Sequence, residues 1–265
     1  MSRFPRFAGA FALAAIMMAL GGCATAIKPH ETTGAPTLDF QSMALNPSNG
    51  GELIKADALQ PGDIILTAEN GLNSVGIRLI TLSPVSHAAI YMGNQQIAEA
   101  VGSGIRIRSV DAMLGDEATV VAFRHPDLTA GQAVQINTFV ASHEGKKYNY
   151  LGVMLQAPFA LERRLCELPL VPSMVRDFCI RGIAAVQLGL GRNDQFFCSQ
   201  FVLEAYNQAG LPVTTADPRW VSPADLLHMR EGDVPSIPAT QPLRYVGHLK
   251  YNPPPVIVVD GTTAR

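Results

Sequence analysis

Residues 193–206 read NDQFFCSQFVLEAY, a polar turn that runs directly into an amphipathic helix with Cys198 in its first turn. Backbone N–H groups without helical partners and the positive end of the helix dipole favour a thiolate at such a position. The same N–H groups are suited to bind an oxyanion. Cys198 is therefore a candidate nucleophile, and it needs a histidine as its base.

His87 is the best placed of the six histidines. It lies at the start of the expected strand SHAAIYMG, residues 86–93, in which small residues leave room for another element to pack closely. Without other context, a histidine on an apolar strand is more often structural than catalytic, and that interpretation stays open. The context that favours catalysis is Glu99.

Glu99 lies in the segment IAEAV, residues 97–101, which a turn brings back alongside the His87 strand. Side chains alternate between the two faces of a sheet. If His87 pairs with Glu99, or with Val101 two residues farther on, the side chains of His87 and Glu99 lie on the same face. A two-residue loop would separate them, so the hairpin needs an odd loop or a bulge. Gly93 permits this because glycine tolerates a positive φ. An acid among apolar neighbours indicates a partner, with a solvated strand residue as the alternative.

Four short motifs follow one another in the chain: PGDIIL at 61–66, SHAAIY at 86–91, AEA at 98–100 and FCSQFV at 197–202. Their order resembles the YiiX/YaeF-like group of circularly permuted, papain-like hydrolases of the NlpC superfamily. In that group the histidine precedes the cysteine, as it also does in lecithin:retinol acyltransferase-like proteins. The resemblance covers roughly residues 55–210, and it depends on the order and spacing of the motifs more than on any one of them.

The resemblance implies that Cys198 is the nucleophile, His87 its base and Glu99 the group that orients the base. These are the three residues already favoured by their positions. A further Gly-x-x-Tyr element of the group is similar to residues 145–148, where Tyr148 would line the site or help to bind an oxyanion. A core tyrosine is an equally good interpretation of Tyr148. No cofactor is expected.

The expected fold class is α+β, with a mostly antiparallel sheet or barrel packed against helices. The resemblance specifies a permuted papain-like fold of the NlpC type. We expect the catalytic domain at residues 51–250, with a helical insertion at 150–192 that is longer and more apolar than the compact family core requires. Strands are expected near 64–67, 86–92, 97–101, 104–110, 118–123 and 243–249, and helices near 70–82, 127–145 and 197–210 and from 222.

The N-terminal segment predicts a bacterial lipoprotein. Basic residues, an apolar run too short to span a membrane and the sequence LGGC at 20–23 resemble a lipobox, which implies removal of a signal peptide, residues 1–22, and acylation of Cys23. An ordinary signal peptide with a chance cysteine is the alternative. By the same resemblance, Ala24 favours an anchor in the outer membrane, on its periplasmic face. Residues 23–50 are expected to form a flexible tether, and residues 251–265 an extended tail.

The four cysteines divide between different roles. Cys166 and Cys179 are close in the sequence, and an oxidising periplasm favours a disulfide between them, with two free thiols as the alternative. This pairing, together with lipid on Cys23, leaves Cys198 as an unpaired thiol, as a nucleophile must be. No Cys-x-x-Cys or His-x-x-x-His spacing points to a metal site.

The expected function is hydrolysis of an amide bond in the cell envelope, in a peptidoglycan peptide or a related N-acyl substrate. The net charge of −2 gives no basic footprint for nucleic acid, so the expected partners are the membrane and this substrate. One alternative is an acyl hydrolase or acyltransferase that acts on lipids. Another is a non-catalytic envelope lipoprotein that binds lipid or a partner. The oligomeric state is not predicted.

Overall fold

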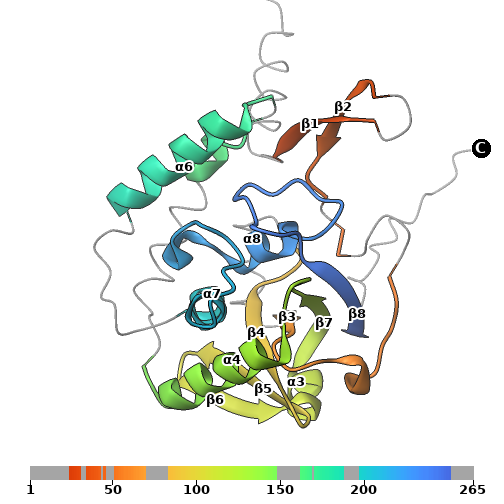
Figure 1. Cartoon of the computed structure of the whole chain (residues 1–265), viewed down its shortest axis with the longest axis vertical. Coiled ribbons are helices and arrows are strands. Elements are labelled where there is room, and N and C mark those ends of the chain that lie inside the picture. The colour runs from red at the N-terminus through yellow and green to blue at the C-terminus, as the bar shows by residue number, and fades with distance from the viewer. Residues whose placement is uncertain are drawn as a thin grey trace, which may run out of the picture.

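A six-stranded antiparallel sheet organises the protein, whose computed structural model describes residues 24–30, 34–42, 44–45, 51–69, 83–147, 162–168, 170–187 and 197–251 (Figure 1). The strand order is β6-β5-β4-β3-β7-β8. In the described part the edge strands β6 and β8 do not pair with each other, so the α+β class is confirmed as an open sheet and not as a barrel. The strands are β3 Ile64–Glu69, β4 His87–Gly93, β5 Gln96–Val101, β6 Gly104–Ser109, β7 Glu117–Arg124 and β8 Arg244–Lys250.

Helices pack on both faces of the sheet. Each face of the sheet carries a hydrophobic core, and side chains along β3 alternate between the two. Ile64 and Leu66 lie in the larger core with α7, whereas Ile65 lies in the smaller core with α3. Phe201 and Tyr206 of α7 are buried in the larger core. The α-helices are α3 Val110–Asp116, α4 Ala130–His143, α6 Ser173–Gln187, α7 Cys198–Gln208 and α8 Pro223–His228, and the 3-10 helices are η1 Ala56–Ala58, η2 Arg163–Leu165 and η3 Pro218–Trp220.

Two of the predicted helix starts are confirmed by their caps. The hydroxyl of Thr129 caps α4 and that of Ser222 caps α8, each within a capping box that satisfies backbone N–H groups on both sides. The short helix α3 was not predicted, because residues 110–116 read as a link between two strands. The helix expected at 70–82 lies outside the described residues.

A bulge sets the register of the β4–β5 hairpin. Gly93 pairs with Gln96 across a two-residue turn, but the register then shifts, and Ala89 pairs with Glu99. Gly93 has a φ of +89°, in the region that glycine adopts at low cost. With Ala89 opposite Glu99, His87 lies diagonally across from Glu99 on the same face, so the predicted bulge and its consequence are confirmed.

The segment expected to be a flexible tether is partly folded, which differs from the prediction. β1 Thr25–Pro29 and β2 Pro36–Phe40 form a two-stranded antiparallel sheet, the N-terminal hairpin. Farther along, Arg230 donates hydrogen bonds to the backbone carbonyls of Ala44 and Leu45. The Thr, Pro and Gly content that suggested a linker conceals alternating apolar positions, which pair across the two strands.

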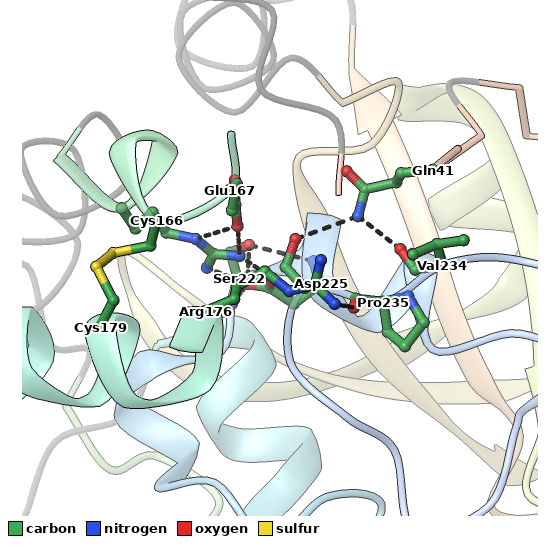
Figure 2. Close-up of polar contacts among 11 residues, drawn as sticks. Gln41, Cys166, Glu167, Arg176, Cys179, Ser222, Asp225, Val234 and Pro235 are labelled. Atoms are coloured by element: carbon green, nitrogen blue, oxygen red, sulfur yellow. Dashed lines mark hydrogen bonds and ion pairs between the residues drawn. A yellow bond between two sulfur atoms is a disulfide. The ribbon is translucent and has the colours of Figure 1, made fainter. Parts of the chain in front are cut away.

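The segment expected as a helical insertion contains η2 and α6, although residues 150–161, 169 and 188–192 lie outside the described residues. A disulfide joins Cys166 to Cys179 of α6, as predicted (Figure 2). Arg163 forms buried ion pairs with Glu167 and with Asp225 of α8, where Ser222 also bonds to Asp225. These contacts hold the insertion against the domain.

Candidate active site

Three elements bring His87, Glu99 and Cys198 together: β4, β5 and the start of α7. The Nε2 atom of His87 lies 2.8 Å from Oε2 of Glu99. His87 also forms a side-chain hydrogen bond with Cys198. Because Glu99 occupies Nε2, the remaining ring nitrogen, Nδ1, is the one that meets the thiol. The structure therefore places the three residues in the order thiol, imidazole, carboxylate.

Cys198 is the first residue of α7, where Phe197 supplies no side-chain cap. The sequence FFC explains this start, because an aromatic residue at the N-cap cannot accept from the free N–H groups of the first turn. The thiol is nearly buried, and burial alone would raise its pKa. The hydrogen bond and charge of His87, with hydrogen bonds from the backbone at Ala88 and Ser199, outweigh burial and lower the pKa of Cys198.

His87 is held in its charged form. Burial disfavours the imidazolium, but hydrogen bonds with Cys198 and Glu99 and the negative charges of both groups raise the pKa of His87 to about 10. Burial likewise opposes ionisation of Glu99, yet its hydrogen bond to His87 and the positive charges around it lower the pKa of Glu99 to about 2. The arrangement stabilises a thiolate beside an imidazolium, the reactive form of a cysteine nucleophile.

Two arginines of β6, which the sequence interpretation missed, complete the surroundings of Glu99. Arg106 donates from Nε to Oε1 of Glu99 at 2.9 Å. Arg108 forms an ion pair with the same carboxylate, with Nε 2.7 Å from Oε1, and donates from Nη2 to Oε2 at 3.4 Å. Arg108 also contacts Asp116 and Glu117. The sequence signal for them was the alternation Arg-Ile-Arg, which places both arginines on one face of the strand. In the hairpin of β5 and β6, Arg106 pairs with Glu99, so both arginines lie on the same face of the sheet as Glu99.

The other predicted site residues divide as follows. Tyr148 and Cys23 lie outside the described residues. Cys166 and Cys179 form a disulfide in the insertion, and Cys198 is a free thiol. Within the described ranges, His, Cys, Asp and Glu side chains form no group of three or more that could hold a metal ion. Over the same residues, none of the helices is both long enough and apolar enough to cross a bilayer.

A surface cavity of about 760 Å³ lies along α7, and the residues that line it do not include Cys198, His87 or Glu99. It runs along a different face of α7 from the one that carries Cys198, where Gln200, Glu204 and Asn207 recur at helical spacing. Its wall combines apolar side chains such as Pro212 and Trp220 with charges of both signs, among them Glu204 and the ion pair of Arg219 and Asp217. Gln200 lies two positions after Cys198, and residues at that spacing project from nearly opposite sides of a helix, so the cavity and the candidate site lie on opposite sides of α7.

The fold and this arrangement define the class: an α+β protein in which a partly buried histidine connects a buried cysteine to a buried glutamate. A curated relative, described as the probable lipoprotein peptidase YaeF of Escherichia coli (strain K12), is 39% identical over 230 residues, which cover 86% of this chain and 83% of that protein. The chain belongs to the YaeF family.

Two further comparisons add little. No protein-family model matches the chain. The crystal structure of the metalloprotein YiiX from Escherichia coli O157:H7 covers 58% of this chain and 69% of its own at 21% identity, with a TM-score of 0.39, a likeness too weak to support an argument.

Proposed function

We propose that this protein is a lipid-anchored cysteine peptidase or amidase of the cell envelope, with Cys198 as nucleophile, His87 as base and Glu99 as the group that orients His87. The hydrogen-bonded series of these three side chains at an uncapped helix start supports the proposal most directly. The description of YaeF as a lipoprotein peptidase agrees with it. The permuted papain-like topology and membership of the NlpC superfamily are part of this proposal.

Acylation begins when the Cys198 thiolate attacks the carbonyl carbon of the amide. A carbon–sulfur bond forms, and the carbonyl electron pair moves to oxygen. The backbone N–H of Cys198 and a second donor near the α7 start stabilise the oxyanion, since the first N–H groups of a helix have no helical acceptors. As the tetrahedral adduct collapses, the carbon–nitrogen bond breaks. Nδ1 of His87 gives its proton to the leaving amine, which departs with the electron pair.

Deacylation uses the same groups in reverse. Neutral His87 removes a proton from water, and the hydroxyl oxygen attacks the thioester carbon. The carbon–sulfur bond then breaks, so that a carboxylic acid leaves and Cys198 is again a thiolate beside the imidazolium. Throughout, Glu99 holds Nε2–H and fixes the ring so that Nδ1 faces the sulfur. Arg106 and Arg108 are positioning residues, because they hold Glu99 ionised.

A peptide is favoured over a lipid acyl chain as substrate, because the relative YaeF is described as a probable peptidase. A lipid acyl group is the second candidate, because several large apolar side chains of the insertion are exposed. The hydrogen bond between His87 and Cys198 argues against a non-catalytic binding module.

The proposal includes the N-terminal processing. A signal peptide at 1–22 is removed, Cys23 is acylated, and the folded domain faces the periplasm from the outer membrane. Mass spectrometry of the protein from bacterial envelopes would show diacylglycerol on Cys23.

Purified sacculi and phospholipid vesicles, incubated in parallel with the protein, separate the two substrate classes. We expect soluble peptides from sacculi, no free fatty acid from vesicles, and no product from Cys198→Ala with either. Iodoacetamide should label Cys198 in the native protein. A Cys198→Ala variant that retains activity would falsify the proposal.

A further inference from the structure

Exposed apolar side chains gather at one end of the molecule. Eleven large hydrophobic residues are exposed in the described part, and eight of them lie in the N-terminal hairpin and the insertion. The eight are Ile27, Leu38, Phe40, Leu165, Leu170, Met174, Val175 and Phe178. Concentration on so small a part of the surface is unusual, since single exposed apolar residues are normally scattered.

The N-terminal hairpin presents one apolar face. Ile27 pairs directly with Leu38, and Phe40 lies two residues farther along on the same side. Ile27 is 73% exposed and Phe40 is 59% exposed. A two-stranded sheet of this kind is only marginally stable in water by itself, and leaving its apolar face in water adds nothing to its stability.

Helix α6 has the same two-sided character. Its inner side carries Ile180 and Arg176, which are buried, and its outer side carries Met174 and Phe178, one turn apart. Met174 is 83% exposed and Phe178 is 81% exposed. The disulfide and Arg163 fix α6 so that this outer side cannot turn inward.

Hydrogen bonds connect the two surfaces. The backbone N–H of Leu170 donates to Oγ1 of Thr25, and Arg176 donates from Nη1 to the Thr25 carbonyl. Figure 1 shows the hairpin and α6 at the same end of the molecule, away from β5, β6 and α4. We call the eight exposed residues together the apolar end.

The proposed lipid attachment point, Cys23, directly precedes Ala24 in the chain. Ala24 is fully buried and Thr25 nearly so, so the described fold begins with the residue after Cys23. Cys23 is four positions before Ile27, the first residue of the apolar end, and consecutive Cα atoms are about 3.8 Å apart, so an acyl chain on Cys23 begins within about 15 Å of that residue. The acyl chains enter the bilayer, and therefore the side chains next to them meet the same bilayer.

We propose that the apolar end is a membrane-docking surface, which inserts into the phospholipid bilayer that holds the acylated Cys23 and fixes the orientation of the domain. The inference rests on the lipid anchor of the proposed function but not on its catalysis. Apolar side chains at the interface add to the binding supplied by acyl chains. The candidate site then works at a fixed height above the membrane.

Fluorescence quenching tests this docking. A tryptophan is placed by Phe178→Trp in a Trp220→Phe background, and the acylated protein is reconstituted in phosphatidylethanolamine–phosphatidylglycerol vesicles with or without brominated acyl chains. Val134→Trp is the matched control, because Val134 is 64% exposed on α4, away from the apolar end. We expect bromine to reduce the fluorescence of the Phe178→Trp protein by about half, since docked side chains reach the acyl boundary, and to leave the Val134→Trp protein unchanged.

A second reporter, Phe40→Trp, tests the hairpin in the same vesicles. Adding Met174→Asp should reduce its quenching, because a carboxylate opposes insertion beside it, and melting curves confirm that the fold is retained. Absence of quenching at both positions, or equal quenching at Val134→Trp, overturns the inference. Mass spectrometry of Cys23 and peptide release from sacculi are recorded separately. Failure of the anchor or of catalysis is thereby distinguished from failure of docking.

Discussion

Two buried clusters of charge in this molecule have opposite character. In the insertion, Arg163 is a permanent cation that is paired with Glu167 and Asp225, and Ser222 satisfies the same aspartate. In the candidate site, the cation is a histidine, which can lose its proton, and its partner is a thiol. Fixed charges that are fully paired hold elements together, whereas titratable charges beside open N–H donors can carry out a reaction.

The largest expected effect comes from removing His87 from the candidate site. His87→Ala removes the base and the charge that lowers the pKa of Cys198, so turnover should fall by roughly 10²- to 10⁴-fold. Iodoacetamide labelling of Cys198 at neutral pH should slow in parallel. His143→Ala, in a histidine outside the site, is the control and should leave both rates unchanged. Equal losses in the two variants would contradict the role of His87.

The ion-pair cluster of Arg163, Glu167 and Asp225 should affect the stability of the fold and not the rate of catalysis. Arg163→Met leaves two buried carboxylates without a cation, and the expected loss is about 3–5 kcal/mol of unfolding free energy, measured with urea. The control is Arg181→Met, whose exposed pair with Asp177 should contribute less than about 1 kcal/mol. An Arg163→Met protein as stable as the Arg181→Met protein would show that the insertion is held by other contacts.

Removing the disulfide gives a smaller loss of the same kind. Cys166→Ser with Cys179→Ser opens a short loop, and the expected cost is about 3 kcal/mol of unfolding free energy. Peptide release below the melting temperature should be retained, because neither cysteine touches the candidate site. A double variant that is fully stable but inactive would instead connect the insertion to catalysis.

The smallest effect concerns pH. Activity should fall as the pH rises through about 10, where His87 loses the proton that the leaving group needs. Glu99→Gln removes a negative charge that raises the pKa of His87, so the alkaline limb of the activity profile should move to lower pH. Arg106→Gln, on a half-exposed side chain, is the milder comparison. An alkaline limb that stays in place in Glu99→Gln would show that Glu99 does not control the ring.

The core of the fold was predictable because its signals are local. Strand alternation, caps such as Thr129 and Ser222, and the glycine at position 93 each report on a few neighbouring residues. The pairing of His87 with Glu99 followed from hairpin parity together with the bulge that Gly93 permits. Even Arg106 and Arg108 could have been found by extending the same register by one strand.

The rest depended on contacts between distant segments. Arg163 and Asp225 are 62 positions apart, and nothing near either residue identifies its partner. The N-terminal hairpin was read as a tether because its composition is that of a linker. Its support comes from distant segments, since Thr25 bonds to the insertion and Lys28 to the Asp233 carbonyl. Which residues are buried where two distant segments meet is decided only when the whole chain has folded, so local sequence patterns do not predict it.

The bulge at Gly93 makes the candidate site sensitive to the parity of loop length. Removing or adding one residue between Tyr91 and Gln96 would turn Glu99 to the opposite face of the sheet, away from His87. A change of two residues would restore the facing pair. Related chains that keep this site should therefore differ in this hairpin by even numbers of residues, and a single-residue deletion should be as damaging as the loss of the carboxylate itself.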